Sequence, residues 1–169
     1  NLSRYAQPGA RHDLQRVDIN ASIASAASLA RRALRDDRIE IRYTTGPATE
    51  ILAKSEEIQQ VLFNIVRNAV QAISGRGHVA IQTAQEGDWV AVRVQDSGKG
   101  IPDENLKRIF DPFFTTKGPD EGTGLGLAIC QRVVSEVGGK MWLEDSALGG
   151  ARFVVDLPAA PESFETASG

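Results

Sequence analysis

Three stretches of the chain repeat apolar residues at the spacing of an amphipathic helix. The first spans residues 20–34, with Asn20 as the expected N-cap. The second follows Ser55, which is the expected cap, and ends before Gly75. The third runs from about Thr123 to Val137, where a glycine pair stops it. Each stretch is long enough to bury one face against a sheet, so we expect three long helices.

Alternating apolar and polar residues predict at least five strands, several of them in hairpins. The strands are expected near residues 39–43, 50–53, 79–81, 90–94, 141–143 and 153–157, with a short strand near 17–19. The elements do not alternate strictly between strand and helix, as they would in a doubly wound fold. We therefore predict an α+β domain in which the helices pack on one face of a mixed sheet.

One long segment has no periodic pattern. Residues 111–122 contain two prolines, two glycines and several polar residues, and a short helix is expected just before them, from Pro102 to about Phe110. A loop of this length in a small domain usually serves a function, and we interpret it as a lid over a ligand. Residues 1–17 are expected to be an upstream helix end and linker, 18–158 the folded domain, and 159–169 a disordered tail.

Composition narrows the class of protein. The 169 residues carry a net charge of −3, which argues against a nucleic-acid binder. A single cysteine excludes an internal disulfide and fits a reducing compartment. No apolar run is long enough to span a membrane. Because the chain does not begin with methionine, we expect a piece of a longer or processed protein.

Two asparagines on the second predicted helix are a candidate metal site. Asn64 and Asn68 are four residues apart and therefore share one helix face. Side-chain carbonyl oxygens suit Mg²⁺, which takes its remaining ligands from water and phosphate. On spacing alone, the pair is equally well explained by hydrogen bonds along the helix surface.

Two glycine clusters are candidates for nucleotide binding. Asp96, after a predicted strand, could accept a hydrogen bond from the amine of adenine, although Asp-Ser-Gly is also ordinary turn chemistry. The Gly-x-Gly-x-Gly run of residues 122–126 leads into a helix N-terminus, which suits phosphate. It lacks the Gly-Lys-Ser/Thr of a Walker loop and does not follow a strand. Lys117 could add a positive charge near a terminal phosphate, or could be an ordinary surface lysine.

Together these segments resemble the sequence boxes of sensor histidine kinases. Residues 64–69 resemble the N box, 96–100 the G1 box, 110–114 the F box and 122–127 the G2 box. The ending at residues 149–158 also fits, and residues 110–117 are most similar to the nitrogen-regulation type of kinase. Each box alone is a weak signal, but four in the right order and spacing are specific.

The resemblance implies a Bergerat ATP-binding fold, a two-layer α/β sandwich with a mostly antiparallel sheet of about five strands and a mobile ATP lid. It implies ATP and Mg²⁺ as ligands, with Asn68 on the metal and Asn64, Asn68 and Lys117 in catalytic roles. The expected nucleotide-binding residues are Asn64, Asn68, Asp96, Gly98, Gly100, Ile101, Phe114, Thr115, Thr116, Lys117, Gly122, Thr123, Gly124, Leu125, Gly126 and Leu127.

Position 64 favours kinase over ATPase chemistry. Hydrolytic relatives such as DNA gyrase usually carry a general-base glutamate there, and an amide cannot accept a proton. A neutral imidazole needs no such base. We therefore expect transfer of the γ-phosphoryl group of ATP to a histidine. Neither His12 nor His78 lies in a helical His-Glu or His-Asp setting, so the acceptor is expected upstream. A hydrolytic ATPase and a non-catalytic nucleotide sensor are the alternatives.

The same resemblance predicts the partners. They are the dimerisation and histidine-phosphotransfer domain of the same protein and the receiver domain of a response regulator. The whole protein is expected to be a cytoplasmic or membrane-anchored homodimer, and this domain a cytoplasmic monomer without nucleic-acid or membrane contact.

Three positions depart from the family pattern. Gln71 replaces a lysine that often reaches the phosphates, Ala151 replaces a threonine or serine near the adenine acid, and Val137 replaces a histidine. Arg67 is expected to face a different side of the helix, which leaves Lys117 as the better substitute for the lysine.

Overall fold

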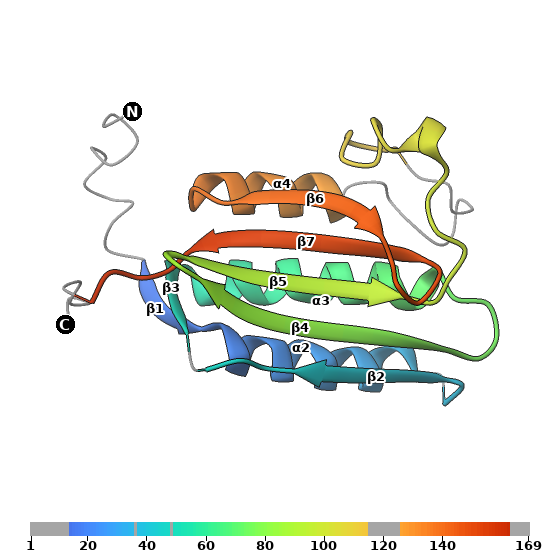
Figure 1. Ribbon diagram of the computed structural model, residues 1–169, viewed down its shortest axis with the longest axis horizontal. Helices are drawn as coiled ribbons and strands as arrows, with labels where there is room; N and C mark the ends of the chain where they lie inside the picture. The colour runs from blue at the N-terminus through green and yellow to red at the C-terminus, as the bar shows by residue number, and fades with distance from the viewer. Residues whose placement is uncertain (1–13, 36, 48, 115–125, 163–169) are drawn as a thin grey trace.

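The computed structural model describes residues 14–35, 37–47, 49–114 and 126–162, and its centre is a five-stranded sheet (Figure 1). The strand order is β2-β4-β5-β7-β6. Only β2 and β4 are parallel, so the predicted mixed and mostly antiparallel sheet is confirmed. The strands are β2 (Ile39–Thr44), β4 (Gly77–Glu86), β5 (Trp89–Asp96), β6 (Lys140–Asp145) and β7 (Ala151–Pro158).

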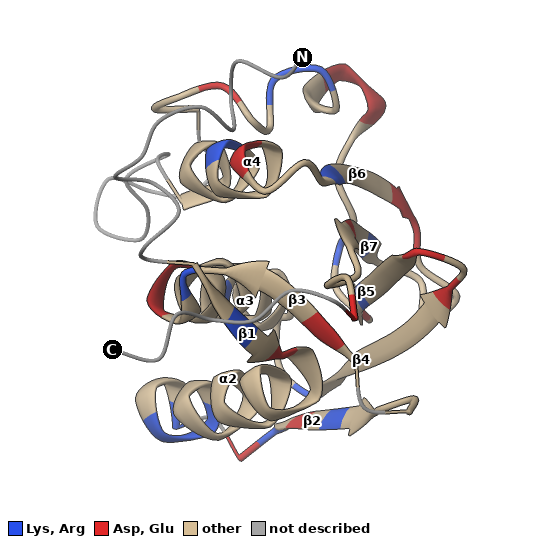
Figure 2. Ribbon diagram, turned by 90° about the vertical axis from the view of Figure 1, so that its left-hand side faces the viewer, with Lys and Arg blue, Asp and Glu red and all other residues tan. Residues whose placement is uncertain are grey.

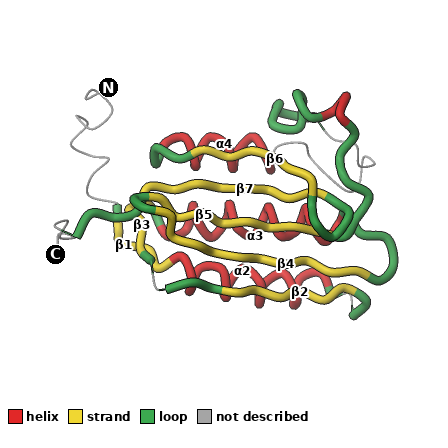
Figure 3. Tube along the Cα trace, viewed as in Figure 1, coloured by secondary structure: helices red, strands yellow, loops and turns green. Residues whose placement is uncertain are grey.

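Among the described residues, three α-helices cover one face of this sheet, as the periodicity predicts (Figures 2 and 3). They are α2 (Ile19–Leu34), α3 (Ser55–Gln71) and α4 (Gly126–Glu136). Their apolar stripes and the inward residues of the strands form one core, which includes Ile23, Ile65, Val92, Val133 and Phe153. Residues 103–105 form a single 3₁₀ turn in place of the longer helix expected before the lid.

Two predicted caps are wrong by one or two residues. The N-cap of α2 is Asp18, whose side chain accepts from the Ala21 amide at 3.2 Å. Asn20 lies inside the helix, where it donates to the Gly46 carbonyl and accepts from the Thr83 hydroxyl. This asparagine therefore ties the loop after β2 to the sheet. Likewise Ser55 is the first residue of α3 and not its cap, and no side chain caps that helix.

A second, two-stranded sheet joins the ends of the domain. Strand β1 (Gln15–Asp18) pairs antiparallel with β3 (Glu50–Ala53). The Ala159 amide donates to Asp88 at 2.8 Å and the Ala160 amide donates to Glu50 at 2.7 Å. Residues 15–17 and 159–161 therefore form hydrogen bonds just outside the limits of 18 and 158 that the sequence leads us to expect for the domain.

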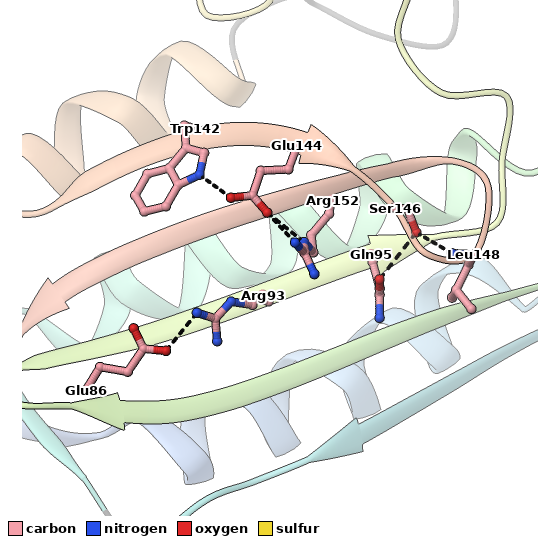
Figure 4. Close-up of polar contacts among 8 residues, drawn as sticks. All are labelled: Glu86, Arg93, Gln95, Trp142, Glu144, Ser146, Leu148 and Arg152. Carbon is pink, nitrogen blue, oxygen red and sulfur yellow. Dashed lines mark hydrogen bonds and ion pairs between the residues drawn. The ribbon is translucent and has the colours of Figure 1, made fainter.

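The face of the main sheet opposite the helices carries an ordered polar network (Figure 4). Arg152 donates through Nε to Glu144 at 2.9 Å, and the indole N–H of Trp142 donates to the same carboxylate at 2.9 Å. Arg93 forms an ion pair with Glu86 at 2.8 Å. The Arg152–Glu144 pair joins β7 to β6 and the Arg93–Glu86 pair joins β5 to β4, whereas Trp142 and Glu144 lie on the same strand.

The terminal contacts can be tested by truncation. A chain ending at Pro158 loses the amide bonds of Ala159 and Ala160 and the bond from the Arg16 guanidinium to the Pro161 carbonyl. We expect its free energy of unfolding to be about 2–3 kcal/mol lower than that of a chain ending at Glu162, since each bond contributes about 1 kcal/mol. Urea denaturation measures the difference. Equal midpoints would show that these contacts contribute nothing.

Candidate nucleotide-binding site

A buried carboxylate lies at the end of the central strand. Asp96 is the last residue of β5 and only 1% exposed. Its Oδ1 accepts from the amides of Gly98 at 2.9 Å and Ala151 at 3.3 Å. Burial raises the pKa of this carboxyl, and the two amide bonds lower it only in part. No described residue donates to Oδ2, so that oxygen can accept a hydrogen bond from a ligand.

Glycines allow the backbone to close around this carboxylate. A Cβ on Gly150 would lie 2.1 Å from Asp96 Oδ1, and one on Gly98 would lie 2.4 Å from the Ala72 carbonyl oxygen. Gly100 has a φ of 72°, which other residues rarely adopt. The Lys99 amide donates to Ala72 at 3.3 Å. The G1 segment therefore packs directly on the C-terminal end of α3.

The turn between β6 and β7 positions the second half of this pocket. Ser146 donates through its hydroxyl to Gln95 at 3.4 Å and accepts from the Leu148 amide at 3.0 Å (Figure 4). The Gly150 amide donates to the Asp96 carbonyl at 3.2 Å. Ala151, which lacks the hydroxyl common at its position, still contributes its backbone amide to Asp96. Sequence reasoning omitted Gly150 from the site, although the glycine pair before the last strand was a signal.

The asparagine pair lies on α3 beside the start of α4. A Cβ on Gly126, the first residue of α4, would lie 3.9 Å from the Asn64 side-chain amide. Asn64 and Asn68 are both half-buried. The N-terminus of α4 offers free amides and a favourable dipole for anions. The two helices therefore bring Asn64 next to Gly126, the last glycine of the predicted phosphate cradle.

Cys130 fixes the contact between these helices. It is fully buried, and its Sγ donates to the Val61 carbonyl at 3.7 Å. Burial raises the pKa of the thiol to about 11, although a hydrogen bond with Asn64 lowers it. The thiol is therefore protonated at neutral pH, and Cys130 holds the seam between α3 and α4 as a packing residue.

The remaining predicted site residues divide into two groups. Ile101, Phe114 and Leu127 pack against the core, and the Arg108 guanidinium lies 4.7 Å from the Phe114 ring centroid. The other group lies outside the described residues, so its role stays a prediction; it consists of Thr115, Thr116, Lys117, Gly122, Thr123, Gly124 and Leu125.

Two cavities lie near this end of the sheet. One of about 200 Å³ is lined by Ile101, Leu143, Gly150 and Ala151 among others. A larger one of about 1010 Å³, lined by Arg31, Arg35, Arg38 and Arg76 among others, contains none of the predicted site residues. Within the described residues, the corner at Asp96 combines a buried acceptor with glycines that permit close approach, so this corner is the candidate nucleotide site.

Comparison with known proteins defines the class. The sequence profile of the histidine kinase-, DNA gyrase B- and HSP90-like ATPases matches residues 53–161. The chain belongs to this family of ATPases. It is 40% identical over 168 residues to the signal transduction histidine-protein kinase AtoS of Escherichia coli K12, covering 98% of the chain and 27% of AtoS. It is 38% identical over 145 residues to the sensor protein FixL of Bradyrhizobium diazoefficiens, covering 83% of the chain and 28% of FixL.

Solved structures agree with the sequence relatives. The catalytic domain of histidine kinase ThkA superposes with a TM-score of 0.78 at 35% identity, covering 88% of this chain and 99% of that one. Full-length ShkA in complex with AMPPNP has a TM-score of 0.77 at 31% identity, covering 95% and 35%. The predicted sandwich of a histidine kinase catalytic domain is therefore confirmed. The chain spans less than a third of the length of AtoS and FixL.

No helix in the described part of the chain is long and apolar enough to cross a membrane.

Gly150→Ala tests the close approach at the carboxylate. The added methyl group would displace Asp96 or the β6–β7 turn, so we expect a loss of stability of about 1–3 kcal/mol and loss of ATP binding. Gly87→Ala is the matched control: φ there is 62° with open space around it, so it costs about 1–2 kcal/mol but spares binding. Thermal unfolding and calorimetry measure both. Normal ATP affinity in Gly150→Ala would contradict this geometry.

Asp96→Asn separates stability from binding. The folded pKa of Asp96 lies above the ordinary value of 3.8, so its contribution to stability is full below that pH and is lost as pH rises through the folded pKa. Without nucleotide, we expect the variant to unfold at a higher temperature than the wild type at pH 7, and the gain to vanish towards pH 3.8. Its ATP affinity should fall about a hundredfold, because an amide N–H can face the adenine amine. Unchanged affinity would exclude the base-reading role.

Proposed function

We propose that this chain is the domain of a sensor histidine kinase that binds Mg-ATP and presents its γ-phosphoryl group to a histidine on a dimerisation domain of the same protein. The observation that carries the proposal is the position of Asn64, an amide side chain, against the N-terminus of α4. A hydrolytic relative would need a carboxylate at this place to activate water.

Each part of the site has a defined task in this proposal. The free oxygen of Asp96 accepts from the adenine amine, and Gly98 and Gly100 let the backbone approach the base. Asn68 supplies a hard oxygen to Mg²⁺, with Asn64 beside the metal and phosphates. Lys117 and the glycines of the G2 box complete the phosphate contacts.

The protein contributes position and charge neutralisation. Bound Mg-ATP supplies an electrophilic phosphoryl group, and the histidine supplies a nucleophile that is already competent when neutral. The site then needs no base to remove a proton before the attack, which agrees with the absence of a carboxylate at position 64. The other ring nitrogen of the phosphorylated imidazole releases its proton to water afterwards. Its task is to hold the terminal phosphate in line with the incoming imidazole.

The partners of the parent protein follow from the same proposed function. A solved structure describes histidine kinase ThkA in complex with the response regulator TrrA, and its kinase chain is 32% identical to this one with a TM-score of 0.74. We propose that the parent protein is a homodimer that passes its phosphoryl group to a response regulator receiver domain. Its catalytic domain would work in the cytoplasm.

A transfer assay tests the proposal. The chain is incubated with γ-labelled ATP and Mg²⁺, alone and with the dimerisation domain of its own parent protein. We expect acid-labile label on the histidine of that domain, no stable label on the chain alone, and at least about a hundredfold loss for Asn68→Ala because metal binding fails.

Three results would contradict this proposal. Steady release of phosphate by the chain alone, abolished in Asn68→Ala, would make it a hydrolytic ATPase. Magnesium-dependent ATP binding without transfer would make it a nucleotide sensor. Stable label on the chain itself would show that the acceptor lies within these residues.

A further inference from the structure

Arg67 has a buried donor without an acceptor. This half-buried arginine lies on α3, directly before Asn68. Its Nε is shielded from solvent and has no hydrogen-bond partner. Within the described part of the chain, the guanidinium forms no hydrogen bond and no ion pair. Buried polar groups are nearly always paired in folded proteins, so this exception requires an explanation such as a ligand.

The expectation that Arg67 faces away from the family's lysine position is wrong. Helix α3 is continuous from Ser55 to Gln71, so Arg67 and Gln71, four residues apart, share one stripe. Asn64 lies one turn earlier on the same side. The positive charge of Arg67 is also near enough to the Cys130 thiol of α4 to lower its pKa slightly.

The position along the helix indicates which part of a nucleotide Arg67 could meet. The C-terminal end of α3 is the adenine end, because the Ala72 carbonyl packs on Gly98 beside Asp96. Towards the N-terminus come Asn68, Arg67 and Asn64. Arg67 lies five residues from Ala72, about 7.5 Å along the axis. The terminal phosphate, farthest from the base, belongs at the level of Arg67 and Asn64.

We propose that Arg67 is a phosphate-binding residue that recognises the terminal phosphate of the bound nucleoside triphosphate, a role that the lysine absent at position 71 would otherwise take. The inference rests on the function proposed above. A guanidinium offers several donors in a planar fork that fits phosphate oxygens. Ligand binding would give the unpaired guanidinium its acceptor, and would make affinity depend on the third phosphate.

A carboxylate beside the acceptor histidine is the other candidate for this arginine. The burial of the Arg67 Nε favours the nucleotide as its acceptor. A side chain from a second domain would reach this shielded atom less easily than a ligand bound between α3 and α4. Nucleotide affinity, measured without the dimerisation domain, distinguishes the two assignments. Only a contact between Arg67 and phosphate changes that affinity.

Calorimetric titration of the chain with Mg-ATP and Mg-ADP tests the assignment. For Arg67→Gln we expect ATP affinity to fall about tenfold and ADP affinity to change less than about threefold, so that the preference for ATP is lost. The preference of Arg67→Lys for ATP should lie between those of Arg67→Gln and the wild type, because lysine keeps the charge but not the planar fork of donors. Thermal unfolding without nucleotide shows that each variant folds.

Arg132→Gln is the matched control. Arg132 lies on α4 and pairs with Glu136 at 3.2 Å on the exposed surface. Its removal also deletes one positive charge, but it should leave both affinities and their ratio unchanged.

Several outcomes would overturn the inference. If the ratio of ATP affinity to ADP affinity is unchanged in Arg67→Gln, or if both affinities fall equally, Arg67 does not recognise the terminal phosphate. Normal binding with lost transfer to the dimerisation domain would assign Arg67 to the acceptor side. If the wild-type chain binds neither nucleotide, the proposed function and this role of Arg67 are both refuted. If the wild type prefers ATP and the Arg67→Gln variant prefers it equally, only the role of Arg67 is refuted.

Discussion

The site depends on one buried carboxylate held by backbone amides. Asp96 can remain at the end of β5 only because the Gly98 and Ala151 amides share its Oδ1 and because Gly150 has no side chain. Desolvation makes this arrangement costly, which is visible in the raised pKa. This desolvation cost fits a site that is prepared for a ligand. An acceptor oxygen that receives no hydrogen bond from the protein can discriminate between bases.

The strand order explains why these groups meet. Strands β5 and β7 are neighbours in the sheet although more than fifty residues separate them in the sequence. Their pairing brings Ala151 to Asp96, while the packing of Gly98 on Ala72 joins the same corner to α3. Helix α4 then packs along α3 through Cys130, so that its N-terminus lies beside Asn64. In the proposed function, base reading, metal binding and phosphate binding fall to three elements that share one corner.

Local patterns predict the elements of this fold but not its long-range contacts. Periodicity predicts the three helices and the hairpin of β4 and β5, because burial of one face depends on nearest neighbours along the chain. It does not predict that β3 pairs with β1 outside the main sheet, or that Asn20 bonds a distant loop in preference to capping its helix. Gly150 was missed for the same reason, since its role depends on Asp96, which is far away in sequence. Arg67 is different, because its spacing of four residues from Gln71 already places the two on one face of the helix. The four boxes predict the class of site because they combine several such distant segments.

The most direct test is a structure of the chain with Mg²⁺ and a non-hydrolysable ATP analogue. In the proposed arrangement, the adenine amine lies within hydrogen-bond distance of Asp96, the metal on the side-chain oxygen of Asn68, and the terminal phosphate between Arg67 and the N-terminus of α4. An analogue bound in the cavity lined by Arg31, Arg35, Arg38 and Arg76, with Asp96 unengaged, would contradict it.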